Sequence, residues 1–304
     1  MKATIKICIC AVVAAALIAI LCVLLIPSTR WNLPPILHFG NSDSADRYGD
    51  ESSYHIGADT VTERVDSLEI HWSSGKINVT THTGSDILMT ETGYQTERQQ
   101  LRWRVTDGKL VIREHASGLS WNHPNKTLEL SLPEGSYDGF SFNVASAEIS
   151  VDGRLTLDEL DADAASGNLS AVGITANELS FDSASGDCIL TDCTVSAFDA
   201  ETASGNVKLY GSFAEVVLDS ASGDLELRTD TAPKKIDTDV VSGNVAVYLP
   251  DNAQFTASLS SLSGDLNVED FVGSYRDGKF TAGDGSGRYS FGSVSGDVDI
   301  CRNK

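Results

Sequence analysis

The most constraining feature of this sequence is a tripeptide, Ser-Gly followed by Asp or Asn, that recurs at a nearly fixed interval. The seven copies begin at Ser166, Ser185, Ser204, Ser222, Ser242, Ser263 and Ser295. The first six are spaced 19, 19, 18, 20 and 21 residues apart. A fixed period of this length is typical of a stacked architecture, in which one repeat needs a neighbour to bury its apolar face.

Apolar residues keep a constant register around each copy of the motif. In the copy at Ser185, Leu179 and Phe181 lie six and four residues earlier, and Cys188 and Leu190 lie three and five residues later. Both arms therefore alternate with a period of two, which indicates β-strands. Counted from the motif Ser, the inward-facing residues lie at even distances before the motif and at odd distances after it. The residue two positions before the Ser is usually small.

The change in parity predicts a tight turn at the motif Gly. Glycine can adopt a positive φ there without steric cost, and the following Asp or Asn can hydrogen-bond the local backbone. The sequence therefore predicts an all-β fold, a β-solenoid or a rolled sheet built on the same principle, with about 19–20 residues per rung. The small residues near the motif indicate a narrow interior.

A degenerate copy and an insertion mark the two ends of the repeat array. Ser74-Gly75 follows a strand-like alternation over residues 68–72, whereas the last two motif copies are 32 residues apart and enclose the turn sequence Asp277-Gly278. We expect the excess to form one hairpin inserted before the final rung, because the end of a stack needs cover against edge-to-edge pairing.

An apolar segment without charge spans residues 7–26. Twenty residues at the helical rise span about 30 Å, the thickness of a bilayer core. Lys2 and Lys6 precede the segment, so the positive-inside tendency places the N-terminus in the cytoplasm. A cleaved signal peptide is the alternative, but no small-x-small cleavage site follows the segment. We expect residues 1–26 to be a transmembrane signal anchor formed by one helix.

Two further units follow the predicted anchor. Residues 27–64 are rich in Ser, Asp and Pro and are predicted to be a flexible polar linker. Residues 65–304 carry the strand pattern and are predicted to form one extracytoplasmic β-repeat domain, which the linker would hold away from the membrane.

The chain is strongly acidic, with 22 basic and 43 acidic residues and a formal net charge of −21. This charge argues against nucleic acid and against anionic lipid surfaces as partners of the domain. Cys188, Cys193 and Cys301 follow the apolar segment, and an odd number of cysteines predicts no disulfide framework. Cys188 occupies an inner position, where we expect a buried small hydrophobe.

Asp or Asn follows Ser-Gly in every copy, so stacking would align these side chains in one column. The members of this Asp/Asn column are Asn168, Asp187, Asn206, Asp224, Asn244, Asp265 and Asp297. A row of carboxylates could bind Ca²⁺, which takes six to eight oxygen ligands. We favour the alternative that these side chains satisfy backbone groups of the turns, since the chain lacks the nonapeptide repeat of calcium-binding solenoids.

The sequence contains no arrangement that indicates catalysis. All six histidines, from His38 to His123, precede the regular repeats, so the motif serines have no predicted partner base. Trp121 lies in a predicted loop, where it could stack on a sugar ring. We assign no catalytic, cofactor-binding or metal-binding residue, and we expect no cofactor.

The repeated Ser-Gly-Asp/Asn units, the strand Asp107-Gly108-Lys109-Leu110-Val111-Ile112 and the closing segment over residues 283–298 together resemble a known family. They are similar to the bacterial "putative adhesin" domain family, which includes LiaG-like proteins, and the resemblance covers about residues 65–300. It implies an extracytoplasmic, repeat-built β fold, often tethered by one membrane helix, and it supplies no catalytic residue.

These observations predict a single-pass protein of the bacterial cell membrane that is not an enzyme. It would act in surface adhesion, envelope scaffolding or envelope-stress sensing. Its partners would be the cytoplasmic membrane, through the N-terminal helix, and an unknown envelope protein or glycan, but not nucleic acid. The alternative is a carbohydrate-active enzyme, a polysaccharide lyase or hydrolase, built on a β-solenoid that uses the Asp/Asn column and Trp121.

Overall fold

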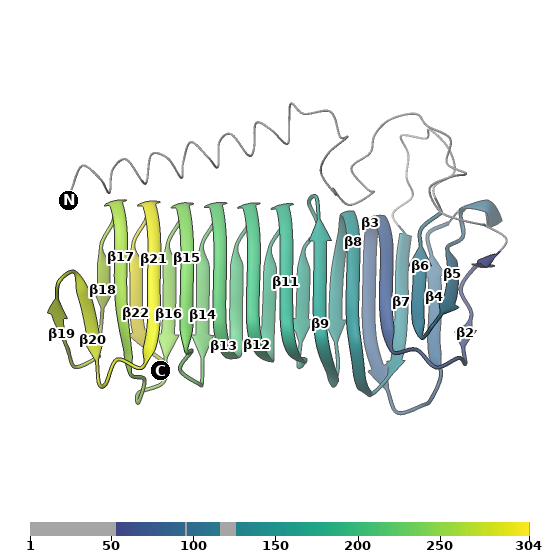
Figure 1. Ribbon diagram of the computed structural model, residues 1–304. Helices are drawn as coiled ribbons and strands as arrows, with labels where there is room; N and C mark the ends of the chain where they lie inside the picture. The colour runs from purple at the N-terminus through teal and green to yellow at the C-terminus, as the bar shows by residue number, and fades with distance from the viewer. Residues whose placement is uncertain (1–52, 95, 116–125, 304) are drawn as a thin grey trace.

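The computed structural model describes residues 53–94, 96–115 and 126–303. Within these ranges the chain is all-β apart from a 3₁₀ turn at Glu97–Gln99, and its strands join into one continuous array (Figure 1). No helix in these ranges combines the length and the hydropathy that a membrane crossing requires. The predicted anchor over residues 1–26, and the predicted linker as far as residue 52, lie outside the described residues.

The strands fall into three groups along the chain. The N-terminal group is β1 (His55–Ile56), β2 (Thr60–Val61), β3 (Ser67–His82), β4 (Ile87–Thr92), β5 (Arg102–Thr106), β6 (Lys109–Arg113) and β7 (Lys126–Pro133). The central group is β8 (Gly135–Asp152), β9 (Leu155–Ala164), β10 (Leu169–Val172), β11 (Thr175–Ser185), β12 (Cys188–Ser204), β13 (Val207–Ser222), β14 (Leu225–Thr229), β15 (Lys235–Ser242) and β16 (Val245–Leu249). The C-terminal group is β17 (Phe255–Ser263), β18 (Leu266–Val268), β19 (Gly273–Arg276), β20 (Lys279–Ala282), β21 (Gly287–Ser295) and β22 (Val298–Arg302).

Each rung of the solenoid consists of one strand segment before the motif Ser and one after it. Neighbouring rungs pair parallel and in register, so that Leu179 of β11 lies beside Phe198 of β12, and Cys188 lies beside Val207 of β13. Most strand residues therefore lie next to the residue at the same place in the adjacent repeat, with one register shift between β12 and β13 at Thr191–Cys193. The predicted all-β repeat fold is confirmed.

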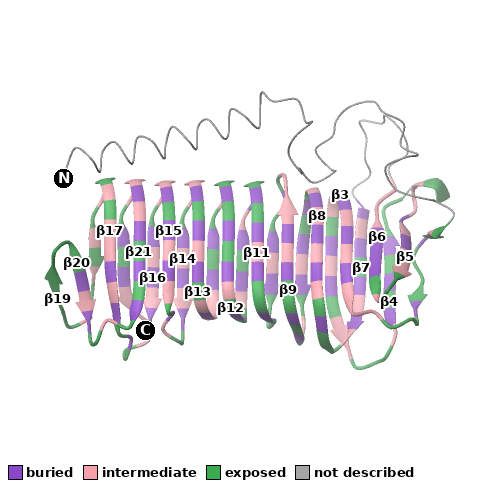
Figure 2. Ribbon diagram, viewed as in Figure 1, coloured by how far each residue is buried: buried purple, intermediate pink, exposed green. Residues whose placement is uncertain are grey.

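The inner side of each rung carries the alternating apolar residues. Figure 2 shows buried and more exposed residues alternating along the strands. Phe181, Cys188 and Leu190 are 0% exposed, as the register around Ser185 predicts. Cys188 and Cys193 are buried and form no disulfide within the described residues. Burial raises the pKa of the Cys188 thiol, which keeps this side chain unreactive.

The motif glycines meet a need for close backbone contact. Gly223 and Gly243 have φ angles of 151° and 158°, whereas Gly186 and Gly205 lie outside the left-handed region. At all four positions a Cβ atom would lie 1.9–2.0 Å from the carbonyl oxygen of the glycine one rung away. The positive φ predicted at the motif glycines is therefore wrong for Gly186 and Gly205. We call the motif glycines, which stack from rung to rung, the glycine column. What the positions share is that no side chain fits between the stacked backbones.

The last rungs are stacked in an order that differs from their order in the sequence. β21 and β22 pair with β15 and β16 on one side and with β17 and β18 on the other. Figure 1 shows the yellow β21 between β15 and β17. The expectation that Ser295 belongs to the final rung is wrong. All rungs have the same alternation of apolar residues around the motif. The sequence pattern therefore permits both the order of the rungs along the chain and the stacking order that is observed.

The hairpin expected between the last two motif copies is present as β19 and β20. Its strand β20 pairs antiparallel with β17, so it covers part of the edge of the rung that ends the stack. An antiparallel cover of this kind interrupts further parallel stacking.

The N-terminal end of the stack is built in a similar way. β3 lies between β8 on one side and β6 and β7 on the other, and β4 and β5 add antiparallel strands outside β7 and β6. β1 and β2 fall within residues 27–64, where the sequence predicts a linker. Val61 of β2 is only 1% exposed, and its burial joins this segment to the end of the solenoid.

Candidate functional site

A column of acidic side chains lies on the outer face of the strands that precede the motif. Its members, three residues before the motif Ser in five consecutive rungs, are Asp163, Asp182, Glu201, Asp219 and Asp239. They pair in register from each rung to the next. We call these five residues the acidic column. Adjacent strands lie about 4.8 Å apart, so the acidic column places like charges at that spacing.

Burial and mutual repulsion both disfavour the charged forms along the acidic column. Partial burial, with the nearby carboxylates of Asp161 and Asp182, raises the pKa of Asp163 to about 6. Burial and Asp161 also raise the pKa of Asp182, and burial with Asp182 and Asp219 raises that of Glu201. A positive charge placed over the column would relieve this repulsion, so the face is suited to a cationic ligand group.

Asp163→Asn is expected to raise the melting temperature at pH 7 and to have little effect near pH 4. The pKa of Asp163 is higher in the folded protein than the ordinary value of 3.8, so the folded state binds this proton more tightly. The stability that results is fully present below that ordinary value and is lost as the pH rises through about 6. The side-chain amide of the Asp163→Asn variant does not ionise, so the variant does not lose stability in this way.

Thermal melts of the wild type and of Asp163→Asn, recorded between about pH 4 and pH 7, measure the effect as a difference in melting temperature between the two proteins. Contributions from titrating groups far from Asp163 cancel in that difference, whereas Asp161 and Asp182 lose a repelling neighbour and add to it in the same direction. A difference that stays constant with pH would contradict the assigned repulsion.

The Asp/Asn column links neighbouring rungs by hydrogen bonds. Oδ1 of Asn168 accepts a hydrogen bond from the backbone N–H of Asp187 at 2.8 Å, and Oδ1 of Asp187 accepts one from the N–H of Asn206 at 2.7 Å. The same contact recurs at Asp224, Asn244, Asp297 and Asp265. These side chains therefore satisfy backbone groups, as we favoured, but those groups belong to the next rung.

Metal binding gains no support from these positions. In the part of the chain that the structure describes, no group of three or more His, Cys, Asp or Glu side chains is arranged to hold a metal ion. In six of the seven members of the Asp/Asn column, all except Asp265, the Oδ1 atom already accepts a hydrogen bond from the next rung.

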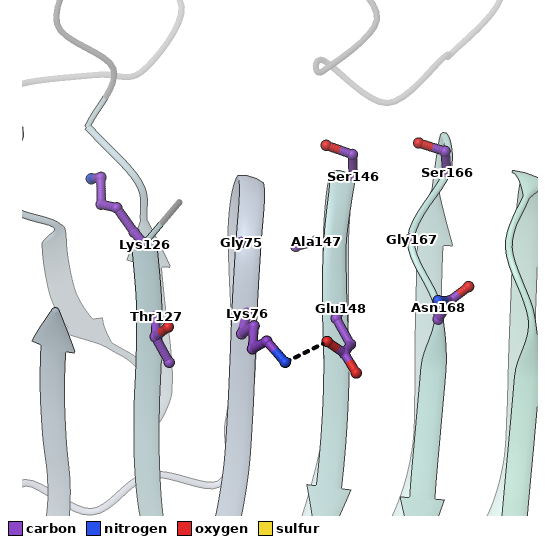
Figure 3. A pocket seen from close by; sticks show the side chains of 10 residues that line it. All are labelled: Gly75, Lys76, Lys126, Thr127, Ser146, Ala147, Glu148, Ser166, Gly167 and Asn168. Carbon is purple, nitrogen blue, oxygen red and sulfur yellow. Dashed lines mark ion pairs between the residues drawn. The ribbon is translucent and has the colours of Figure 1, made fainter. Parts of the chain in front are cut away.

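A pocket of about 320 Å³ lies at the edge formed by the motif turns, near the N-terminal end of the stack. Its lining residues are Gly75, Lys76, Lys126, Thr127, Ser146, Ala147, Glu148, Ser166, Gly167 and Asn168 (Figure 3). Lys76 and Glu148 form an ion pair across neighbouring strands at 2.8 Å, and both side chains are more than half exposed. The lining offers this solvated ion pair, the hydroxyl groups of Thr127, Ser146 and Ser166, and Lys126.

A buried charge network lies beside this pocket, and the sequence analysis did not identify it. The ammonium of Lys126 lies 3.1 Å from Glu91 and 3.6 Å from Glu114, with these three side chains 1–4% exposed. Lys126 also donates to the backbone oxygen of Gln99 at 2.5 Å, and Glu91 accepts from the N–H of Leu101 at 2.8 Å. A signal was present, because Glu91 and Lys126 occupy the apolar phase of their strands.

Two of the four histidines in the described residues, His71 and His82, make local contacts at the N-terminal end. Nε2 of His71 lies 2.7 Å from Glu69, and Nε2 of His82 lies 2.9 Å from the backbone oxygen of Asp86. Burial lowers the pKa of His71, although Glu69 opposes this effect. Both histidines are on β3, away from the regular motif serines. Trp121 lies outside the described residues.

Comparison with known families and structures places this architecture among described proteins. A family model described as Toastrack DUF4097 matches residues 65–301. A solved structure described as a "putative adhesin" from Bacteroides fragilis is similar in fold, with a TM-score of 0.51 and 14% identity, over 81% of this chain and 97% of that chain.

Two further solved structures show weaker overall agreement. A "putative adhesin" from Parabacteroides merdae has a TM-score of 0.46 and 11% identity, over 82% of this chain and 96% of that chain. A "putative lipid binding protein" from Parabacteroides distasonis has a TM-score of 0.43 and 13% identity, over 82% of this chain and 97% of that chain. No curated protein matches this chain.

Proposed function

The chain belongs to the Toastrack DUF4097 family, and from that premise we propose that it is a non-catalytic binding protein of the bacterial cell envelope. The apolar segment over residues 7–26 anchors it in the cytoplasmic membrane, and the β-solenoid lies outside that membrane. There it acts in adhesion, scaffolding or stress sensing by binding an envelope protein or glycan.

The acidic column is the observation that carries this proposal. Its five side chains are presented by the outer faces of paired strands, so their spacing is set by backbone hydrogen bonds. Such an array is rigid before a ligand arrives, which reduces the conformational entropy lost on binding. Burial, and after it the repulsion of neighbouring carboxylates, raises the pKa of Asp163, Asp182 and Glu201, which supports an array of closely spaced acidic groups. We propose that a partner with regularly spaced cationic groups binds this face.

The competing function, a carbohydrate-active enzyme, has less support. The Asp/Asn column that would supply its carboxylates is engaged in backbone hydrogen bonds between rungs. A hydrolase or lyase needs an acid and a base directed at one substrate bond. The carboxylates of the acidic column lie in a row on the outer face of the strands, an arrangement suited to binding a repeated cationic ligand.

Capture of the full chain from solubilised bacterial membranes tests the proposal. The wild type is compared with the triple variant Asp182→Asn/Glu201→Gln/Asp219→Asn. The matched control is Glu63→Gln/Glu97→Gln/Glu134→Gln, which removes the same charge from exposed positions at the N-terminal end. We expect the wild type and the control to retain the same envelope partner and the acidic-column variant to lose at least tenfold of it.

Two results would count against the proposal, and they concern different parts of it. Recovery of the full chain only in the soluble fraction would contradict the membrane anchor. Equal retention of the partner by all three proteins would contradict the acidic column as the binding surface, whatever the location of the chain.

A further inference from the structure

A second column, on the inner side of the solenoid, consists of hydroxyl side chains. It lies two residues before the motif Ser, next to the glycine column. In spatial order its members are Ser183, Thr202, Ser220, Val240, Ser293 and Ser261, paired in register from rung to rung. The one apolar member separates a run of three hydroxyls from a run of two.

These hydroxyl oxygens are shielded from solvent, and none of them makes a hydrogen bond with a protein group. Ser183, Thr202, Ser220 and Ser293 are 6–9% exposed as whole residues. A buried polar group without a partner costs about 1–3 kcal/mol. Five such groups would cost about as much as the whole net stability of a typical domain, about 5–15 kcal/mol. The column therefore needs partners that the chain does not supply.

The hydroxyls cannot satisfy one another. Adjacent rungs are about 4.8 Å apart, and the pairing is in register, so neighbouring hydroxyl oxygens are separated by roughly that distance. An O–H···O hydrogen bond needs about 2.5–3.0 Å. One water molecule between two such hydroxyls can reach both of them at hydrogen-bonding distance.

The hydrogen-bond directions in such a chain are compatible. A serine or threonine hydroxyl has one donor and two acceptor sites, so each can donate to the water on one side and accept from the water on the other. Each water bridges two hydroxyls with one donor and one acceptor, and it keeps one donor and one acceptor for other polar groups.

We propose that a single file of ordered water molecules runs inside the solenoid along this column. One water occupies each gap between Ser183, Thr202 and Ser220, and one occupies the gap between Ser293 and Ser261. Val240 interrupts the file. Thr238 lies two residues before Val240 on the inner side of the same rung. It is 1% exposed, and its hydroxyl also makes no hydrogen bond to a protein group. The file is part of the folded structure and is independent of the function proposed above.

Water oxygen-17 magnetic relaxation dispersion on the full chain tests the proposal, because it counts waters that remain bound for longer than the tumbling time. The variant is Ser183→Ala/Thr202→Val/Ser220→Ala. Ala164 and Val240 occupy the same slot in other rungs, so the slot accepts these side chains. The control is Ser170→Ala, which removes a hydroxyl from the outer face of β10.

We expect the triple variant to lose a dispersion amplitude equivalent to two long-lived waters and the control to lose none. Equal amplitudes for the wild type and a folded triple variant would overturn the proposal. If circular dichroism shows the variant unfolded, a crystal structure of the wild type at atomic resolution decides the question. Ordered density between Ser183, Thr202 and Ser220 supports the file, and empty space there overturns it.

Discussion

Lys126→Met is expected to lower the free energy of unfolding by about 3–5 kcal/mol. The substitution keeps much of the side-chain volume but removes the positive charge that is paired with both Glu91 and Glu114. Both carboxylates would remain almost completely buried. Removing one partner of a buried ion pair costs far more than the pair contributes, because the other charge stays out of water without compensation.

The matched control for this experiment is Lys76→Met. Lys76 forms an ion pair with Glu148 at 2.8 Å, the same kind of contact in an exposed position at the rim of the pocket (Figure 3). Exposed ion pairs contribute little, so we expect almost no change in stability. Equilibrium denaturation of both variants measures the contrast. Similar losses for Lys126→Met and Lys76→Met would show that the buried network does not carry the stability that we assign to it.

Gly223→Ala is expected to lower the free energy of unfolding by at least about 2 kcal/mol. The added methyl group would lie 1.9 Å from the carbonyl oxygen of Gly205, and the φ of 151° already disfavours a side chain. Two paired rungs would have to separate to admit this one carbon atom. The neighbouring contact with Gly243 would shift as well, because Gly223 lies between the two.

Gly135→Ala is the control for this substitution. Gly135 also lies in a strand, but a Cβ atom there would meet nothing within 4 Å. We expect Gly135→Ala to leave stability unchanged or slightly improved, since alanine restricts the unfolded chain. Chemical denaturation of the two variants gives the comparison. If both alanines are tolerated equally, close backbone contact is not the reason for the glycine column.

Much of the fold follows from local patterns in the sequence. Leu179, Phe181, Cys188 and Leu190 alternate around Ser185, and all are buried, because a strand places every second residue on one face. The repeat length gives the rung, and the hairpin signal at Asp277-Gly278 corresponds to β19 and β20. These features depend on residues that are close in the sequence, so the pattern alone is enough to predict them.

The candidate sites were harder to predict. The acidic column joins Asp163, Asp182, Glu201, Asp219 and Asp239, which are about one repeat apart and become a continuous surface only when the rungs pair in register. The spacing could have shown this column in advance, because all its members hold the same place before the motif. The Lys126 network had a weaker signal, since charged residues in an apolar phase do not reveal their partners.

The sequence by itself determined the rung: which residues form strands, which side chains face inward and where the chain must turn. The tertiary structure alone decided how the rungs are ordered, placing β21 and β22 between earlier rungs and β3 inside the N-terminal end. The physical reason is that every rung presents the same apolar face and the same backbone hydrogen bonds. The repeated pattern is therefore compatible with several neighbours for each strand, and the order becomes visible only in the tertiary pairing.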